Sequence, residues 1–340
     1  MTRPAVRAAF FSDDPPPKYG ALWRVFDEPR RRRIESSAYL EPQVISSSNL
    51  REHAARLGDL EVVFATWGMP ALAGPQLDLL KSLKAVFYAA GSVKAFAAPL
   101  LERGIIVVGA ADANAVPVAE YALAAILLSL KRFWPQALAL RDRRRPDAWT
   151  RQPMTGAYGS VVGLIGLSRT GRKVAQLLRS FDVKVIAYDP LVSPDEAGRL
   201  GVETAGLEEI FRRADVVSLH APLLPRTVGM ISGAMLESMK TNATFINTAR
   251  GAIVREQEMA AVLRRRGDLW AILDVTDPEP PPSGSPLYEL PNVLLTPHIA
   301  GSMDAEVRRM ADLVLDEFDA WLAGRPLRHA VSLADLETMA

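Results

Sequence analysis

Short runs of apolar residues, rich in Val, Ile and Phe, alternate along this chain with segments whose apolar residues recur at helical spacing. Strands that are apolar throughout are typical of parallel sheets buried on both faces, and their alternation with helices predicts an α/β fold. Two series are present. The first has candidate strands at Val6–Ser12, Gln43–Ser47, Glu61–Trp67, Lys84–Ala89 and Ile105–Ala110. The second has them at Val161–Gly166, Val183–Asp189, Asp215–Ala221, Thr244–Ala249, Leu269–Val275 and Asn292–Thr296. Six strands are the number expected of a dinucleotide-binding sheet.

Helical spacing predicts two longer elements outside these strands. Val118–Phe133 is a candidate helix, and a basic stretch from Arg141 to Arg151 with Trp149 follows it. That stretch has little helix or strand signal, so we expect an arm that reaches a second subunit. Asp304–Leu322 repeats apolar residues at helical spacing near the end of the chain.

The composition narrows the classes of function. The 340 residues include 40 basic and 39 acidic side chains, and this balance gives no field for binding nucleic acid or an anionic membrane. The absence of cysteine excludes disulfides and thiolate chemistry and is compatible with a reducing cytoplasm. The chain begins without the apolar core of a signal peptide, and its most apolar stretch, Val116–Leu130, is shorter than the ~20 residues of a membrane span. We therefore expect a cytoplasmic protein in which any anion is bound locally.

A glycine motif follows the first strand of the second series. Gly166-Leu167-Ser168-Arg169-Thr170-Gly171 comes directly after Val161–Ile165 and opens a helical segment. Gly166 permits a tight turn, Gly171 permits close packing of helix on strand, and the N–H groups of the helix start bind a pyrophosphate. Ser168 stands where a glycine usually lets the backbone approach phosphate, so its side chain must either point away or contribute its hydroxyl as a donor.

An acidic residue ends the next strand. Asp189 lies eighteen residues beyond Gly171, where a carboxylate accepts hydrogen bonds from both ribose hydroxyls of a dinucleotide. Its charge would also repel a 2′-phosphate. The glycine motif and Asp189 together predict a domain that binds NAD in preference to NADP.

Three polar residues follow the last three strands of the second series, namely Arg250, Glu279 and His298. Because the carboxyl ends of parallel strands meet at one edge of a sheet, we expect them to share a site that faces the nicotinamide. Arg250 can hold a carboxylate and polarise the adjacent carbonyl. His298 can donate a proton to that carbonyl oxygen or accept it in reverse, and Glu279 can fix the imidazole tautomer and favour its charged form. No metal is required. His220, at another strand end, is expected at the cofactor.

These motifs, in this order, make the chain similar to the D-isomer-specific 2-hydroxyacid dehydrogenases over nearly its whole length. The matching segments are Asn114–Ala122, Gly163–Gly171, His220–Leu223, Ile246–Val254, Asp274–Pro280 and Thr296–Ser302. The resemblance implies an NAD-dependent oxidoreductase that interconverts a small D-2-hydroxy acid and its 2-keto acid. Its catalytic residues would be Arg250, Glu279 and His298.

The resemblance also implies binding residues and a partner. Asp274 would lie near the nicotinamide carboxamide. The other implied cofactor-binding residues are Ala221, Pro222, Thr248 and Ala249. Backbone N–H groups that hold the substrate carboxylate would be those of Ala90, Gly91 and Ser92. A homodimer is implied, built largely on the Val118–Phe133 helix and the arm after it, about residues 118–155.

We therefore predict two doubly wound parallel-sheet α/β domains. Residues 1–112, completed by 304–340, form a smaller, flavodoxin-like substrate-binding domain, and residues 113–303 form a larger Rossmann NAD-binding domain, with the active site in the cleft between them. Val93 and Lys94 stand where many members of the family carry Asp and Asn, which leaves the substrate side chain unassigned. Two alternatives stay open. One is oxidation of another small anion such as phosphite, and the other is a NAD-sensing binding protein that resembles transcriptional corepressors.

Overall fold

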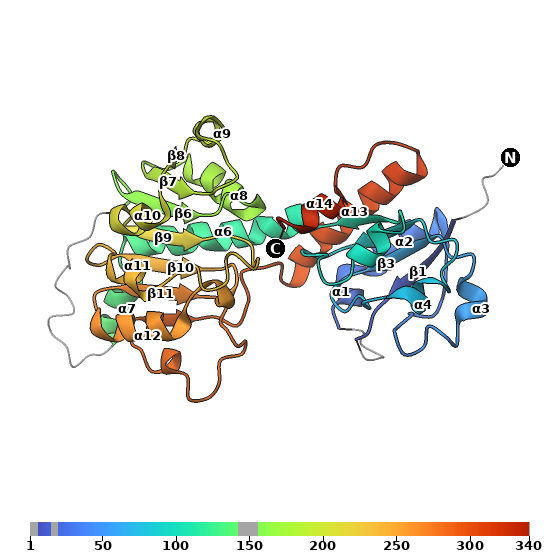
Figure 1. Ribbon diagram of the computed structural model, residues 1–340, viewed down its shortest axis with the longest axis horizontal. Helices are drawn as coiled ribbons and strands as arrows, with labels where there is room; N and C mark the ends of the chain where they lie inside the picture. Colours follow the sequence, from blue (N-terminus) through green and yellow to red (C-terminus); the bar gives the residue numbers. More distant parts are fainter. Residues whose placement is uncertain (1–5, 15–19, 142–155, 340) are drawn as a thin grey trace. The chain divides into compact units, whose positions relative to one another are not determined.

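The chain folds into two compact units. The computed structural model describes residues 6–14, 20–141 and 156–339. Unit 1 comprises Met1–Asn114 with Ser302–Ala340, and unit 2 comprises Ala115–Gly301, so the chain passes between them twice (Figure 1). The expected domain boundaries, at residues 112 and 304, lie next to these crossings. The expected arm after Arg141, including Trp149, lies outside the described residues apart from its first residue.

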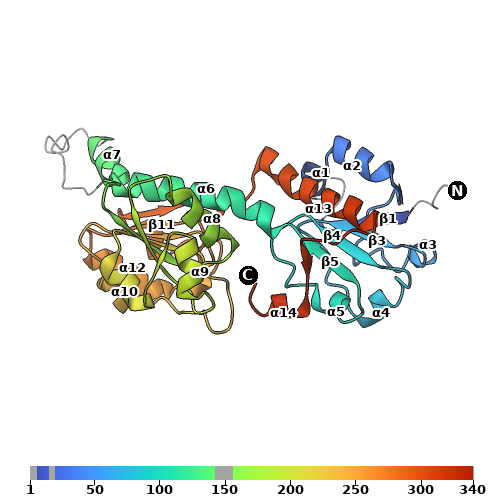
Figure 2. The ribbon, with the colours of Figure 1, turned by 90° about the horizontal axis from the view of Figure 1, so that it is seen from above.

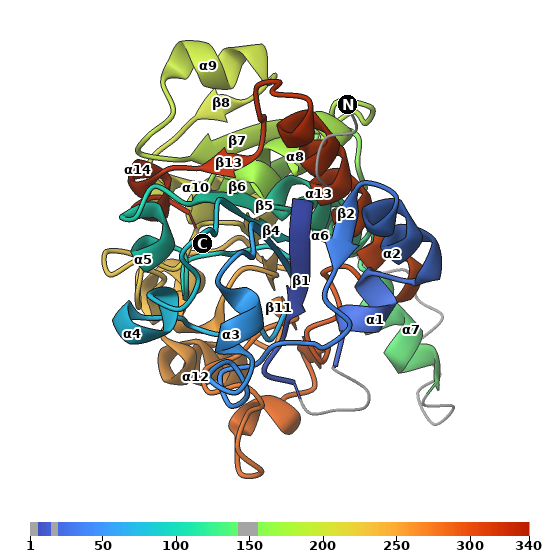
Figure 3. The ribbon, with the colours of Figure 1, turned by 90° about the vertical axis from the view of Figure 1, so that its right-hand side faces the viewer.

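Unit 1 is built on a sheet of parallel strands with one antiparallel edge. Its strands are β1 (Val6–Phe11), β2 (Ala38–Leu40), β3 (Val62–Ala65), β4 (Ala85–Tyr88), β5 (Ile106–Gly109) and β13 (Ala330–Val331). Their order is β13-β5-β4-β3-β1-β2, and only β13 pairs antiparallel among the described strands (Figure 3). Without β13 this is the 2-1-3-4-5 order of flavodoxin-like folds.

Helices cover both faces of this sheet. On one face lie α1 (Leu22–Val25), α2 (Glu28–Glu35) and α13 (Val307–Leu322), and on the other α3 (Ala54–Leu57), α4 (Gly74–Leu77), α5 (Ala98–Leu101) and α14 (Leu333–Leu336) (Figure 2). A short 3-10 turn, Asp304–Glu306, precedes α13. Successive residues of β1 enter opposite cores, because side chains alternate along a strand: Phe10 packs with α13 and Phe11 with α3. The largely apolar strands of the sequence reflect this burial on both faces.

The second strand of unit 1 is not the one that the sequence predicts. We expect Gln43–Ser47, but the strand that pairs with β1 is β2, and within the expected segment only Ile45 forms a bridge, to Phe11. The reason is local. Asn49 accepts from the Ser46 N–H at 2.8 Å and donates to the Val44 carbonyl at 3.0 Å, which turns the chain instead of extending it.

Unit 2 contains a seven-stranded parallel sheet. Its strands are β6 (Val161–Ile165), β7 (Lys184–Tyr188), β8 (Glu203–Thr204), β9 (Val216–Leu219), β10 (Thr244–Asn247), β11 (Trp270–Leu273) and β12 (Val293–Leu295). The order β12-β11-β10-β9-β6-β7-β8 contains the Rossmann arrangement, in which the strand order reverses between β6 and β9. The six expected strands are present. The additional strand, β8, has two residues and is too short to give a periodic signal.

Helices also cover both faces of the unit 2 sheet. They are α6 (Ala111–Leu130), α7 (Phe133–Arg141), α8 (Arg169–Leu178), α9 (Pro194–Arg199), α10 (Leu207–Arg213), α11 (Gly233–Glu237) and α12 (Glu256–Arg265), with 3-10 turns at Gly251–Ile253 and Pro286–Tyr288. α6 and α8 pack on one core, and α10, α11 and α12 pack on the other. α6 begins seven residues before the expected start and runs through Pro117. By length and composition it could cross a membrane, but half of its most apolar window is buried.

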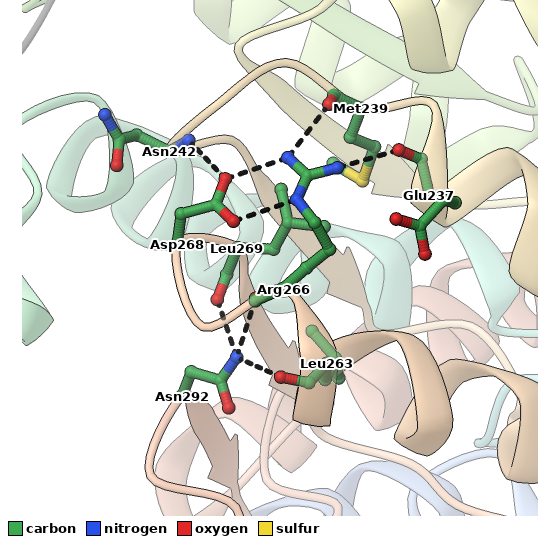
Figure 4. A network of polar contacts seen from close by, with 8 residues as sticks. All are labelled: Glu237, Met239, Asn242, Leu263, Arg266, Asp268, Leu269 and Asn292. Atoms are coloured by element: carbon green, nitrogen blue, oxygen red, sulfur yellow. Dashed lines mark hydrogen bonds and ion pairs between the residues drawn. The ribbon is translucent and has the colours of Figure 1, made fainter.

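A polar network joins the amino-terminal ends of three strands of unit 2 (Figure 4). Arg266 donates to both carboxylate oxygens of Asp268 at 2.8 Å, and Asp268 accepts from the backbone of Asn242 ahead of β10. The buried Asn292 ahead of β12 donates to the carbonyls of Leu263, Arg266 and Leu269. These contacts satisfy buried backbone groups. They lie at the sheet end opposite the candidate site and stabilise the sheet.

Candidate active site

The glycine motif of unit 2 forms a turn that only glycine can make at its two ends. Gly166 follows β6 with φ +94°, and a Cβ there would lie 2.6 Å from the backbone nitrogen of Ala221. A Cβ at Gly171 would overlap the carbonyl oxygen of Gly166. The first turn of α8 therefore packs directly against the end of β6. This close approach brings the amino terminus of α8, with its partial positive charge, to the carboxyl edge of the sheet.

The structure resolves the direction of the Ser168 side chain. Its hydroxyl donates to the His220 carbonyl at 2.8 Å and accepts from the Gly171 N–H at 3.4 Å. Its φ of −61° is one that any residue adopts, so a glycine is not needed for backbone geometry. Within the described residues, the N–H groups of Ser168 and Thr170 have no acceptor. Of the two possibilities left open by the sequence, Ser168 points into the protein and caps α8.

Asp189 lies immediately after β7 and contacts the glycine motif. One carboxylate oxygen accepts from the Leu167 N–H at 2.7 Å and the other from the Leu191 N–H at 2.9 Å. Each oxygen keeps lone-pair capacity for a further donor such as a ribose hydroxyl. The two backbone bonds hold the carboxylate beside the turn and fix its orientation before any ligand arrives.

Two buried side chains lie side by side where β9 and β10 end. Asn247 pairs with Leu219 in the sheet, so Thr248 and His220 are the next residues of neighbouring strands. Among the described residues, neither ring nitrogen of His220 nor the Thr248 hydroxyl has a hydrogen-bond partner. Burial lowers the pKa of His220 to about 4, so the imidazole is neutral at physiological pH. Orphaned buried polar atoms at this edge, together with the α8 amino terminus, fit a dinucleotide that brings its own donors and acceptors.

His298 and Glu279 form the central pair of the candidate site. Nδ1 of His298 lies 2.6 Å from Oε1 of Glu279, and both side chains are about half exposed. An ionised carboxylate only accepts, so Nδ1 carries the proton in this contact and Nε2 is left for another partner. His298 has φ +53°, which is unfavourable for a residue with a Cβ. Such strain persists where surrounding contacts impose it, and it is frequent at functional sites.

Asp274 supplies those contacts. It is 2% exposed, and its carboxylate accepts from the N–H groups of Ile299 and Ala300 at 2.8 and 2.9 Å and from the Thr296 hydroxyl at 2.6 Å. The His298 N–H donates to the Asp274 carbonyl at 3.1 Å. Tyr121 of α6 extends the network with a 3.0 Å bond to Thr296. Asp274 therefore holds both sides of the loop that carries His298, and we describe it as a positioning residue.

Arg250 follows β10 and is largely buried. Its guanidinium donates to the Ala249 carbonyl at 2.6 Å. Burial lowers the pKa of Arg250, whereas the negative charge of Glu279 raises it. The next residue, Gly251, is essential to this arrangement, since a Cβ there would overlap the backbone of Thr276 in the loop that leads to Glu279. The supporting residues Gly251, Thr296 and Tyr121 lie in segments that match the family, but the sequence alone predicts no role at the site for them.

The substrate-binding residues expected from the sequence lie in unit 1. Ala90, Gly91 and Ser92 follow β4, and the Ala90 carbonyl accepts from the Ala110 N–H at 3.0 Å. A Cβ on Gly91 would lie 3.3 Å from the amide nitrogen of Asn114. The other expected cofactor residues, Arg169, Ala221, Pro222 and Ala249, lie at the carboxyl edge of the unit 2 sheet. The structure thus brings the cofactor candidates together and pairs His298 with Glu279.

Comparison with known proteins identifies the family. Residues 123–300 match the model described as D-isomer specific 2-hydroxyacid dehydrogenase, NAD binding domain. D-3-phosphoglycerate dehydrogenase of Archaeoglobus fulgidus is 34% identical over 239 residues, which are 69% of this chain and 44% of that protein. The chain therefore spans less than half the length of the curated relatives that it matches.

Solved structures agree over nearly the whole chain. The TT0316 protein from Thermus thermophilus has a TM-score of 0.71 and 30% identity, covering 95% of this chain and 99% of that one. D-mandelate dehydrogenase of Rhodotorula graminis is 24% identical with a TM-score of 0.76, and the match covers 97% of this chain and 98% of that one. At this identity the match supports the fold alone. The chain belongs to the D-isomer specific 2-hydroxyacid dehydrogenase family, and NAD is the cofactor of its unit 2. The predicted family, fold class and cofactor are confirmed.

Proposed function

We propose that this protein is an NAD-dependent dehydrogenase that interconverts a small D-2-hydroxy acid and its 2-keto acid. The observation that supports this most directly is the 2.6 Å contact between His298 and Glu279, made by an imidazole in a strained loop held by a buried carboxylate. In this proposal His298 is the general acid and base, Glu279 is its partner, and Arg250 binds the substrate carboxylate and carbonyl. The backbone N–H groups of residues 90–92 provide further donors to the carboxylate.

The division of labour follows from the chemistry of each group. Because Nδ1 of His298 donates to Glu279, Nε2 can give a proton to the carbonyl oxygen during reduction and take it back during oxidation. Glu279 fixes the ring orientation and stabilises the positive charge that His298 carries before it donates. The planar guanidinium of Arg250 can bond a carboxylate and a carbonyl with one rigid group.

Unit 2 would hold NAD along its carboxyl edge. The amino terminus of α8 would receive the pyrophosphate, Asp189 the adenosine ribose, and the edge near His220 and Thr248 the nicotinamide half. When bound, the reduced cofactor supplies the hydride that the carbonyl carbon receives. Asp189 lies where a 2′-phosphate would be repelled, which favours NAD over NADP.

The proposal is tested by following NADH oxidation with glyoxylate, hydroxypyruvate, pyruvate, phenylpyruvate, branched 2-keto acids and phosphohydroxypyruvate. The last belongs in the screen because relatives of this chain are D-3-phosphoglycerate dehydrogenases. We expect turnover of at least one compound, and loss of about 10³-fold or more in His298→Ala with NADH affinity retained. The matched control is His53→Ala in unit 1. NADH binding without turnover of any 2-keto acid would instead favour a NAD-sensing binding protein.

We also propose that the protein acts as a cytoplasmic homodimer. α7 has no buried residue among its nine, and Phe133 and Leu140 are 44% and 38% exposed. Apolar side chains exposed on this helix fit an interface with a second copy. Analytical ultracentrifugation of wild type and Phe133→Asp/Leu140→Asp tests this proposal, and a monomeric wild type would refute it.

A further inference from the structure

The carboxyl edge of the unit 1 sheet has the topology of a ligand-binding edge. The chain leaves β1 for β2 on one side and returns to β3 on the other, so the strand order reverses between β1 and β3. Ligands of open parallel sheets bind beyond the carboxyl ends of the strands at such a point. The residues there are 12–14 after β1 and 66–69 after β3, and 89–92 follow the neighbouring β4. We call these three segments the substrate edge.

The first two segments of the substrate edge are bonded to each other and carry two carboxylates. The Asp13 N–H donates to the Gly68 carbonyl at 2.7 Å, and the exposed Asp13 side chain accepts from the Ser47 N–H at 2.6 Å. Gly68 has φ +90°, and a Cβ on it would lie 3.0 to 3.1 Å from the carboxylate atoms of Asp14. Glycine at this position therefore lets the Asp14 carboxylate lie against the loop after β3. Two negative charges are thus held beside the strand ends.

Trp67 is the large apolar group of the substrate edge. Trp67 is 39% exposed, whereas the preceding residue, Thr66, is fully buried. Thr66 donates to the Ala89 carbonyl at 2.8 Å, which ties the loop to the end of β4 and fixes the backbone that carries the indole. A partly exposed indole on a fixed backbone offers a broad face for an apolar group at little cost in conformational entropy.

Basic side chains are scarce here. Among the described residues of the three segments, together with the two residues after the last segment, Lys94 is the one cation. Its ammonium lies 3.4 Å from the Met339 carbonyl. A phosphate dianion is ordinarily bound by arginine, lysine or a helix amino terminus. Placing it beside Asp13 and Asp14 would instead bring like charges together, which opposes binding.

From this juxtaposition we propose that the substrate edge selects a 2-keto acid with an uncharged, apolar side chain. Trp67 packs against that side chain, and the carboxylates of Asp13 and Asp14 exclude a phosphorylated one. The inference rests on the proposed function and specifies its substrate class. It separates this chain from the D-3-phosphoglycerate dehydrogenases with which it shares about a third of its aligned residues.

The charge component is tested with two substrates that differ by one phosphate. We compare kcat/KM for hydroxypyruvate and phosphohydroxypyruvate, using NADH, in wild type and in Asp13→Asn/Asp14→Asn. The wild type should favour hydroxypyruvate by about 100-fold, and the double variant should reduce that ratio about tenfold. The control is Asp59→Asn/Asp78→Asn, which removes the same charge from exposed sites of unit 1 away from these loops. If the ratio of the two kcat/KM values is the same in Asp13→Asn/Asp14→Asn as in wild type, the two carboxylates do not have this role.

The apolar component is tested with phenylpyruvate. The ratio of its kcat/KM to that of hydroxypyruvate should fall roughly 10- to 100-fold in Trp67→Ala. The same ratio should be unchanged in the control Tyr39→Ala, which removes another exposed aromatic side chain of unit 1. Because each readout is a ratio within one variant, partial loss of folded protein does not affect it. A ratio that is the same in Trp67→Ala as in wild type refutes the packing.

Two outcomes overturn the whole inference. One is phosphohydroxypyruvate as the preferred substrate. Lys18, four residues after Asp14 in the sequence, lies outside the described residues, and loss of that preference in Lys18→Ala would assign phosphate binding to it. The other is preference for a 2-keto acid with a cationic side chain, since Asp13 and Asp14 would then attract the substrate. Failure to reduce any 2-keto acid refutes the proposed function itself, which keeps the two failures distinct.

Discussion

Replacing His220 with leucine should make unit 2 less sensitive to acid. The imidazole is 4% exposed, and neither nitrogen has a partner among the described residues. Burial lowers its pKa from 6.5 to about 4. In the unfolded chain the same group takes up a proton near pH 6.5, so between these values the unfolded state binds more protons than the folded state. The contribution of His220 to stability is therefore full above pH 6.5 and is lost as the pH falls from 6.5 to about 4.

The size of the effect follows from the two pKa values. A difference from 6.5 to about 4 corresponds to roughly 3 kcal/mol when the titration is complete, and most of that is lost between pH 7.5 and pH 4.5. Leucine has a similar volume and no polar atoms. At pH 7.5 the variant should thus be as stable as wild type, because a buried imidazole without partners contributes little.

Urea unfolding at pH 7.5 and pH 4.5 measures the difference. Wild type should lose roughly 2 to 3 kcal/mol more than His220→Leu between the two conditions, equivalent to roughly 5 to 10 °C in Tm for a unit of this size. The control is His53→Leu, at the start of α3 in unit 1. If wild type and His220→Leu lose stability in parallel as the pH falls, then His220 either gains a partner in solution or is not buried, and the account of this edge is wrong.

Four further changes test the other parts of the site. Asp189→Ser should narrow the gap between the Kd values of NADH and NADPH in fluorescence titrations, and equal affinities in wild type would contradict the ribose role. Gly171→Ala should destabilise by roughly 3 kcal/mol or more in urea unfolding, because its Cβ meets a backbone carbonyl, whereas Gly198→Ala in an open helical position should stabilise slightly. Arg250→Lys should lower kcat/KM about 100-fold, since a point charge cannot replace the planar group. Asp274→Asn should lower kcat at least tenfold with NADH affinity within threefold of wild type, and an unchanged kcat would exclude the positioning role.

The sequence predicts the strands that are buried on both faces and the residues at their ends. β6 and β7 are largely apolar runs, and the turns after them carry Gly166 and Asp189, whose backbone and charge requirements leave a clear pattern. The same holds for Arg250, Glu279 and His298, because the rule that parallel strands end at one edge converts their positions along the chain into proximity. Proximity is observed for His298 and Glu279, and the negative charge of Glu279 opposes the lowering of the Arg250 pKa by burial.

Features that depend on tertiary contacts leave no such pattern. β2 is three residues long, and β8 and β13 have two residues each. Whether such short strands form depends on pairing with a neighbouring strand and not on the periodicity of the sequence. The Ser168 side chain could have faced solvent or protein. It faces the protein because its hydroxyl donates to the carbonyl of His220, just after the neighbouring strand β9. The strained backbone of His298 and the carboxylate of Asp274 that supports it are likewise consequences of packing.

Substrate choice is the property that the motifs convey least, and the structure gives the reason. In the proposed function, the motif residues of unit 2 act on atoms that every 2-hydroxy acid has, namely its carboxylate, its oxygen and the proton on it, so their spacing would be the same for any substrate. A side chain instead meets local charge and shape, which here are set by a φ of +90° at Gly68, by the carboxylate packed against it, and by the indole beside it. In the sequence alone, a single glycine such as Gly68 gives no indication of which substrate is bound. Its consequence, two carboxylates and a tryptophan at one sheet edge, appears only when the strand order is known.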